Sequence, residues 1–270
     1  MISTTNQEFG KEAPITVKRG KVNDYLGMTL DYSEKEKVMV KMLDYVENML
    51  RDAPADMTGE SATPAGNHLF QVNEGAIKLD EDKAQIFHHI VAQALFLCKR
   101  ARPNLQTTVA FLCTRVKQPD IEDYKKLRRM IQYLRLTRNL FLTLEADNLS
   151  VVKWWVDASY AVHADMRSHT GATMSLGKGA IYGTSTRQKL NSKSSTEAEL
   201  IGVSDVMSQI LWTIFFMEAQ GYPLGDNVVY QDNQSAMLLE KSGRGSSSKR
   251  TRHINIRYFF VTDRIKELQT

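Results

Sequence analysis

Two aspartates in the second half of the chain belong to segments that look like β-strands. Asp157 lies inside the apolar run VVKWWVDASYAV, and Asp232 ends the short segment NVVYQD. A carboxylate in such a strand is expected to be partly buried, and a buried charge is costly unless a cation neutralises it. A bound metal ion would satisfy both residues. For either one alone, an exposed acid or an acid paired with Lys or Arg is the simpler interpretation.

Two glutamates lie at the start of a predicted helix that runs from about Ser195 to Gln220. Because Glu197 and Glu199 are two residues apart, they cannot share a helix face, and only one of them can point toward the sheet. Ser194 and Glu197 also have the spacing of a capping box, in which the glutamate only closes the start of the helix. From the residues alone, this structural role is the simpler interpretation of Glu197.

Clustered carboxylates of this kind are suited to phosphodiester hydrolysis. The reaction needs a nucleophilic water and a stabilised leaving oxygen, which two Mg²⁺ ions about 3.5 to 4 Å apart supply together. Mg²⁺ is a hard ion that prefers carboxylate ligands. The prediction therefore depends on acids that are distant in sequence meeting in the fold.

The second half contains the elements that would position these acids. Strand-like segments bounded by glycine or polar turns predict three consecutive antiparallel strands: VVKWWVDASYAV, TGATMSLGKG and AIYGTSTRQK. The long helix follows, with serine at its cap and Gly221 just past its end. After it come a strand, NVVYQD, and a helix, NQSAMLLEKS. Beyond the loop SGRGSSSKR, a last strand is expected in RHINI and a last helix in RYFFVTDRIKEL.

The first half is predicted to hold a β-hairpin and a small helical region. The segments ITVKRGKVNDYLGMTLDYS and KVMVKM flank the charged turn SEKEK, and a short helix follows around LDYVENML. Residues 52–75 predict a long loop because prolines and glycines recur at short intervals. Residues 80–144 show helical spacing in three blocks, broken at Pro103 and Pro119. The boundary between the halves is expected near residues 146–150.

Composition limits the class of protein. With 270 residues and 42% hydrophobic content, the chain can bury one large core or two smaller ones. The net charge of +4 is small, but short basic runs suit a polyphosphate partner, with a solvated helix face as the alternative. Cys98 and Cys113 lie apart in apolar segments, which indicates reduced thiols and no zinc site. No signal peptide and no membrane-spanning run are recognised, so a soluble, intracellular protein is expected.

The motifs WWVDAS, SSTEAEL, YQDNQSA and KRTRHINIRYFFVTDRI, in this order and spacing, resemble the ribonuclease H domain of copia-type LTR retrotransposon Pol polyproteins. The resemblance covers residues 151 to about 268. It implies an α/β fold with a ribonuclease H-like five-stranded mixed sheet and flanking helices. It further implies an enzyme that cuts the RNA strand of RNA:DNA hybrids with two Mg²⁺ ions. It also implies that the first and fourth strands are neighbours. Carried over by motif, Asp157, Glu197 and Asp232 are the metal ligands and catalytic residues.

A fourth acid follows from the same resemblance. Retroviral ribonucleases H carry a loop histidine followed ten residues later by an aspartate on the last helix, and His253 and Asp263 have this spacing. Asp263 is the candidate fourth ligand, and His253 the candidate for proton transfer or product release. The alternatives are a solvated helix acid and a structural histidine. Candidate nucleic-acid contacts, for which capping, turn and flexible-linker roles are the alternatives, are Ser195, Thr196, Asn233, Lys249, Arg250 and Arg252.

The first half resembles another part of the same polyproteins. NDYLGMTLDYS resembles the segment after the polymerase active site, and FHHIVAQALFLCKRARPNLQTTVAFLCTRV and DYKKLRRMIQYLRLT resemble the helical thumb and connection region. The chain is therefore expected to comprise a reverse transcriptase C-terminal region, residues 1–149, and a ribonuclease H-like domain, residues 150–270. No YxDD motif precedes Tyr25, so no DNA synthesis is expected, and the chain is interpreted as a fragment or as cut at its start.

Two functions remain open. The first is an endoribonuclease acting on RNA:DNA hybrid within a Pol polyprotein, located in the cytoplasm or a retroelement particle, with the nucleus as an alternative. The second is a decayed retroelement fragment that binds nucleic acid without turnover. Neither reading involves a membrane.

Overall fold

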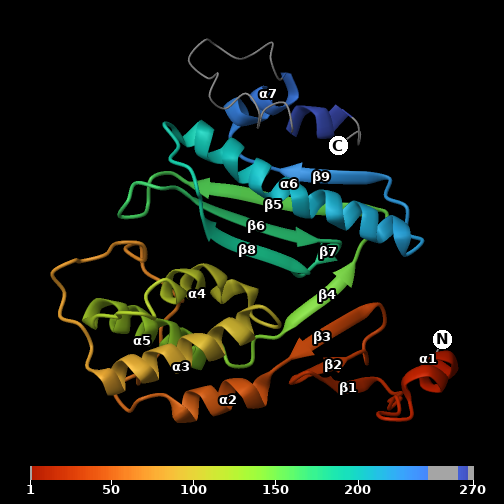
Figure 1. Cartoon of the computed structure of the whole chain (residues 1–270), viewed down its shortest axis with the longest axis horizontal. Coiled ribbons are helices and arrows are strands. Elements are labelled where there is room, and N and C mark those ends of the chain that lie inside the picture. The colour runs from red at the N-terminus through yellow and green to blue at the C-terminus, as the bar shows by residue number, and fades with distance from the viewer. Residues whose placement is uncertain (1, 243–260, 267–270) are drawn as a thin grey trace.

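The structure, a computed structural model, describes residues 2–242 and 261–266. It is an α/β arrangement in which each half of the chain contributes a sheet with its own helices (Figure 1). Two large clusters of buried apolar side chains correspond to these two parts, one built around Leu97, Leu112 and Leu134 and the other around Trp154 and Ile210. The division at residues 149 and 150 remains a prediction, because a strand from the second half joins the first sheet.

The first sheet has five antiparallel strands in the order β1-β2-β3-β4-β7. Their bounds are β1 Val22–Tyr25, β2 Met28–Asp31, β3 Lys37–Lys41, β4 Leu142–Ala146 and β7 Gly177–Lys178. The segment predicted as one long strand is split into β1 and β2 by a two-residue turn, in which Leu26 and Gly27 both have positive φ, the geometry of a tight hairpin. The prediction of helix up to Leu144 was wrong at its end, because LTLEA alternates apolar and polar residues and pairs with β3.

The helices of the first half lie close to their predicted positions. They are α2 Leu43–Asp52, α3 Glu81–Cys98, α4 Gln106–Cys113 and α5 Ile121–Leu136. A further helix, α1 Ile2–Phe9, precedes them and was not predicted. A short 3-10 turn, Pro103–Leu105, leads into α4, and Asp120 after Pro119 caps α5. Residues 53–79, all described, contain no helix or strand, which confirms the predicted long loop.

The second sheet positions the acids. Its described strands are β5 Val151–Ser159, β6 His169–Ser175, β8 Tyr182–Arg187 and β9 Asp226–Tyr230, in the order β8-β6-β5-β9. The first three are antiparallel as predicted, and β9 runs parallel to β5, so the sheet is mixed. The predicted fifth strand, in residues 252–256, lies outside the described residues.

Helix α6, Ser195–Ala219, covers one face of this sheet, and α7, Gln234–Ser242, packs beside it (Figure 1). Alternate residues of β5, such as Val152 and Trp154, point toward α6 and are fully buried. By length and composition α6 also resembles a membrane-spanning helix. Its buried residues Val206 and Ile210 nevertheless pack into the cluster that contains Trp154, as in a core helix of a globular domain.

The two halves meet where α4 packs against β8. Gln106 Nε2 donates a hydrogen bond to the carbonyl oxygen of Gly183 at 2.7 Å, and Ser185 Oγ donates one to Thr107 Oγ1 at 3.2 Å. Lys99 Nζ also reaches the Gly183 oxygen, at 3.4 Å. The helical half is therefore fixed against the edge of the sheet that carries the acids.

Candidate metal centre and adjoining groove

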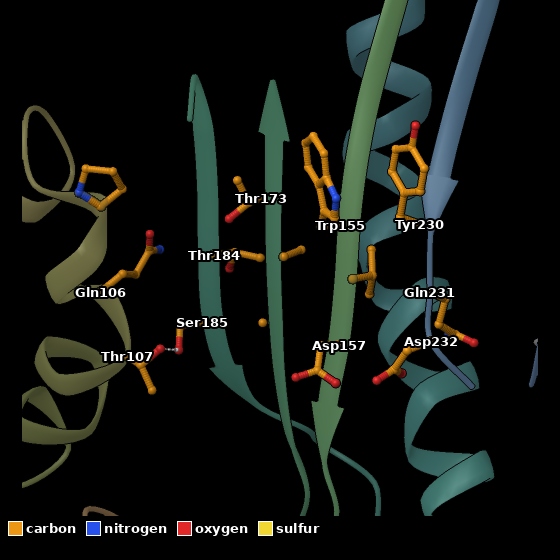
Figure 2. A pocket seen from close by; sticks show the side chains of 14 residues that line it. Gln106, Thr107, Trp155, Asp157, Thr173, Thr184, Ser185, Tyr230, Gln231 and Asp232 are labelled. Carbon is orange, nitrogen blue, oxygen red and sulfur yellow. Dashed lines mark hydrogen bonds between the residues drawn. The ribbon is translucent and has the colours of Figure 1, made fainter. Parts of the chain in front are cut away.

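Three carboxylates from distant parts of the sequence meet at one end of the second sheet. They belong to Asp157 in β5, Asp232 just after β9 and Glu199 in α6, and each contributes an oxygen within 4.8 Å of the others. The parallel pairing of β5 and β9 includes Trp155 opposite Tyr230, so two residues further on Asp157 and Asp232 lie side by side (Figure 2). The predicted proximity of Asp157 and Asp232 is therefore confirmed, and their role as metal ligands stays a prediction.

The third member is Glu199, whereas the prediction was Glu197. Glu197 Oε2 accepts a hydrogen bond from the backbone N–H of Lys193 at 2.6 Å, and its own N–H donates to Ser194 Oγ at 3.2 Å. Glu197 thus closes the start of α6, the structural role that its spacing from Ser194 had indicated. Helical periodicity contained the correct signal, because Glu199 lies one turn before Val203, which packs on the sheet.

Exposure within the acid group differs from expectation. Asp157 and Asp232 are exposed, because they lie on the side of the sheet opposite the part that α6 covers. Glu199, by contrast, is only 5% exposed. The desolvation expected for the strand aspartates therefore acts on the helix glutamate.

Burial raises the pKa of Glu199 to about 7, and the negative charges of Asp157 and Asp232 act in the same direction. A backbone hydrogen bond from Ala158 opposes the shift only in part. The Oε2 atom of Glu199 is buried and has no hydrogen-bond partner. A buried carboxylate that has an unpartnered oxygen and lies beside two further carboxylates fits a hard divalent cation, which would supply the missing positive charge and ligand contact.

Another buried acid, Glu240 in α7, was missed by the sequence analysis. It is 6% exposed, and burial together with the charge of Glu199 raises its pKa to about 7, while the nearby side chain of Gln231 acts in the opposite direction. It lines a cavity of about 250 Å³ behind β9, where both polar side-chain atoms of Asn227 also lack a partner. The run AMLLE places this acid on a mostly apolar helix, which was the available signal.

The remaining predicted site residues have different positions. Asp263 is exposed on the helix of residues 261–266 and does not belong to the acid group found among the described residues. Asn233 Oδ1 accepts from the N–H of Ala236 and so caps α7. Ser195 and Thr196 form the first turn of α6. His253, Lys249, Arg250 and Arg252 lie outside the described residues.

A groove of about 510 Å³ extends from the acid group across the open face of the sheet to α4 (Figure 2). One side carries Trp155 and Tyr230, whose rings are stacked with centroids 5.2 Å apart. The other side carries Gln106 and Thr107 from the helical half. Among the described residues that line the groove there is no lysine or arginine.

Comparison with curated proteins finds transposon polyproteins. The chain is 25% identical over 254 residues to the retrovirus-related Pol polyprotein from transposon TNT 1-94 of Nicotiana tabacum, covering 92% of this chain and 19% of that protein. It is 26% identical over 196 residues to the putative transposon Ty5-1 protein of Saccharomyces cerevisiae, covering 71% and 62%. It is 29% identical over 167 residues to the Pol polyprotein from transposon RE1 of Arabidopsis thaliana, covering 61% and 11%. No family model and no solved structure matches the chain.

These similarities confirm the resemblance to copia-type transposon Pol polyproteins. The chain spans about a fifth of the tobacco polyprotein and less than two thirds of the yeast protein. The similarity to the tobacco polyprotein extends over both halves of the chain, since it covers 92% of the residues.

Proposed function

We propose that this chain, which is similar to copia-type Pol polyproteins over most of its length, is a divalent-cation-dependent endoribonuclease that cuts the RNA strand of RNA:DNA hybrids. The observation that carries the proposal is the meeting of Asp157, Glu199 and Asp232 at the end of the parallel strands β5 and β9. In this proposal residues 150–270 have a ribonuclease H-like fold, and residues 1–149 are a reverse transcriptase C-terminal region.

The three carboxylates would hold the cations. Two Mg²⁺ ions at such a site supply a nucleophilic water and stabilise the leaving oxygen of the phosphodiester. Asp157 and Asp232 are exposed at the mouth of the groove, where ligand oxygens and substrate can meet. Glu199 extends from α6, and below about pH 7 a cation must displace a proton from it, because burial raises its pKa to about 7.

The substrate class follows from the polyprotein similarity and from the groove beside the acids. A hybrid duplex is recognised by its shape and by the 2′-hydroxyls of the RNA strand rather than by base sequence. The groove is lined by hydroxyl and amide side chains, which suit such contacts. In the cell the chain is proposed to act as part of a Pol polyprotein, in the cytoplasm or a retroelement particle.

The test is cleavage of an end-labelled RNA:DNA hybrid in Mg²⁺ by the parent chain and by Asp157→Asn and Asp232→Asn. We expect both variants to lose at least about 100-fold in rate, because metal-ion catalysis is worth several kcal/mol and each 1.4 kcal/mol is tenfold. Asp226→Asn is the matched control, since Asp226 is an exposed acid at the opposite end of β9. Unchanged cleavage in the two site variants would rule out the assigned site.

A second candidate is a fragment that binds nucleic acid without cutting it. One observation favours it: only three acids gather among the described residues, and the predicted fourth, Asp263, is not among them. Tight binding of hybrid by the parent chain with no Mg²⁺-dependent cleavage would support this second function.

A further inference from the structure

Two exposed aromatic side chains, Trp155 and Tyr230, stand beside the acid group and form what we call the aromatic ledge. They are register partners in β5 and β9, and each lies two residues before an aspartate of the group. Their rings are stacked at an interplanar angle of 17°, and they are 43% and 45% exposed. A single exposed aromatic residue needs no explanation, but a stacked pair inside a groove next to a metal-binding group indicates a ligand contact.

The ledge forms one side of the groove, and the helical half forms the other. Figure 2 shows Gln106 and Thr107 of α4 across the strands from Trp155, with the threonines of β6 and β8 on the floor between them. The volume of about 510 Å³ is in the range of small-ligand pockets, which is room for one or two nucleotides within the groove.

The wall opposite the ledge is held in place by hydrogen bonds. Thr107 Oγ1 accepts a bond from Ser185 Oγ at 3.2 Å, and Ser185 Oγ lies 2.6 Å from His169 Nε2. The hydroxyl hydrogen of Thr107 is therefore free of this chain of bonds and can donate to a ligand. Gln106 is fixed by its bond to the Gly183 oxygen, which sets the orientation of the amide.

The charges in the groove select what it can hold. The lining residues described include two carboxylates and no cation, so phosphate groups gain nothing from this surface without a metal ion. Aromatic faces and neutral hydroxyl or amide groups instead suit a base and its sugar, because base stacking does not require charge. The 2′-hydroxyl, which both donates and accepts, distinguishes a ribose from a deoxyribose at such a wall.

We propose that this groove binds one or two unpaired ribonucleotides, with a base on the Trp155–Tyr230 ledge and the ribose hydroxyls against Gln106 and Thr107. The proposal rests on the proposed nuclease function, because the groove opens onto the acids that would cut the strand. It adds a binding site for single-stranded RNA, and it gives α4 of the first half a direct part in holding substrate. The favoured substrate is then a hybrid whose RNA strand has an unpaired end.

The experiment measures binding of a fluorescein-labelled RNA hexamer by anisotropy in Ca²⁺, which carboxylate oxygens also bind, so that the two aspartates do not repel the phosphates. We expect Trp155→Leu and Tyr230→Leu to weaken binding about 5- to 100-fold, since one stacked base contributes about 1 to 3 kcal/mol. Tyr230→Phe keeps the ring and restores parent affinity. Trp212→Leu is the matched control, because Trp212 and Phe216 form an exposed stacked pair on α6 away from the groove.

The opposite wall is tested with Thr107→Val, which removes the hydroxyl and keeps the shape of the side chain. The parent chain is expected to bind the RNA hexamer more tightly than a DNA hexamer of the same sequence. The variant is expected to lose most of this preference. Circular dichroism melting of each variant confirms that it is folded at the temperature of the assay.

Three results would overturn the proposal: no binding of the hexamer by the parent, equal binding by the parent and both leucine variants of the ledge, or an equal loss in Trp212→Leu. Cleavage of fully paired hybrid, measured on the same proteins, keeps this result separate from the nuclease assignment. If Asp157→Asn abolishes cleavage while the ledge variants bind RNA normally, the nuclease assignment is supported and the proposed role of the ledge is contradicted. If no protein, the parent included, cleaves the hybrid but the ledge variants lose RNA binding, the proposed role of the ledge is supported and the nuclease assignment is contradicted.

Discussion

Each half of the molecule buries a pair of carboxylates in or beside a helix, and the two pairs differ in the charges and hydrogen-bond partners around them. At the start of α5, Asp120 and Asp123 form a capping box, and Arg115 Nε lies 2.9 Å from Asp123 Oδ2. Burial alone would raise the pKa of Asp120, but backbone N–H groups and Lys78 hold it below its usual value. Around α6 and α7, Glu199 and Glu240 have raised pKa values of about 7, and each keeps one buried oxygen without a partner.

This difference in pKa shift distinguishes an acid that stabilises the fold from an acid that is suited to binding a cation. A buried carboxylate that meets the chain's own cations and N–H groups stabilises the fold as an anion. A buried carboxylate surrounded by other acids lowers stability when ionised, and it is retained where something outside the chain supplies the positive charge. The first pair therefore belongs to the architecture of α5. In the second half, Glu199 belongs to the proposed chemistry, and Glu240 is a buried acid near it.

The largest expected effect distinguishes two glutamates in one helix turn. Glu199→Gln should lower Mg²⁺-dependent hybrid cleavage at least about 100-fold, because it removes a charged ligand worth several kcal/mol in the transition state. Glu197→Gln should stay within a few-fold of the parent, because glutamine also serves in a capping box. Initial rates at saturating Mg²⁺ give the comparison. A larger loss in Glu197→Gln than in Glu199→Gln would instead support Glu197 as the metal ligand.

Substitution of the structural pair, Asp120 and Asp123, should change the stability of the chain and not its cleavage activity. Asp123→Ala should lower the free energy of unfolding by about 2 to 3 kcal/mol, since it removes a buried partner of Arg115 and one half of the capping box. The midpoint of urea unfolding, followed by circular dichroism, measures the change. Asp82→Ala, at an exposed first-turn acid of α3, is the control and should cost less than about 0.5 kcal/mol. A shift in Asp123→Ala no larger than that control would contradict the structural role.

Glu240 should give a stability effect that depends on pH. Its pKa rises from 4.5 to about 7 on folding, so the folded chain binds more protons than the unfolded chain between these values. The stability that protonated Glu240 contributes is therefore fully present below pH 4.5 and is lost as pH rises through 7. Glu240→Gln should therefore be more stable than the parent by about 2 kcal/mol at pH 8, and the advantage should vanish near pH 4. Urea midpoints at both pH values test this, and a pH-independent difference would contradict it.

The smallest expected effect is the coupling of metal binding to the proton on Glu199. Because that carboxyl titrates near pH 7, a cation must displace a proton below this pH. Apparent Mg²⁺ affinity should rise by up to about tenfold per pH unit below 7 and level off above it. Calorimetry in two buffers of different ionisation enthalpy counts the released protons. Proton release that persists in Glu199→Gln would assign the coupling to another group.

Much of the fold followed from short stretches of sequence. The alternation in VVKWWVDAS, the prolines at 103 and 119, and the serine and glycine that flank α6 each predicted an element that the structure contains. The error at β4 arose because LTLEA directly follows a long helical pattern, and a five-residue strand is decided by the partner with which it pairs. Pairing partners lie outside any local window.

For the site, the sequence by itself determined which acids stand in strands and that one of Glu197 and Glu199 must face the sheet. Those properties depend on the two- and 3.6-residue periods of the backbone, which each segment carries with it. Only the tertiary structure decided that Glu199 joins Asp157 and Asp232, that Glu240 lies close behind them, and that α4 forms the far wall of the groove. These depend on how helices pack on a sheet and how two halves meet, because Coulomb energy and burial are set by distances between residues that are remote in sequence.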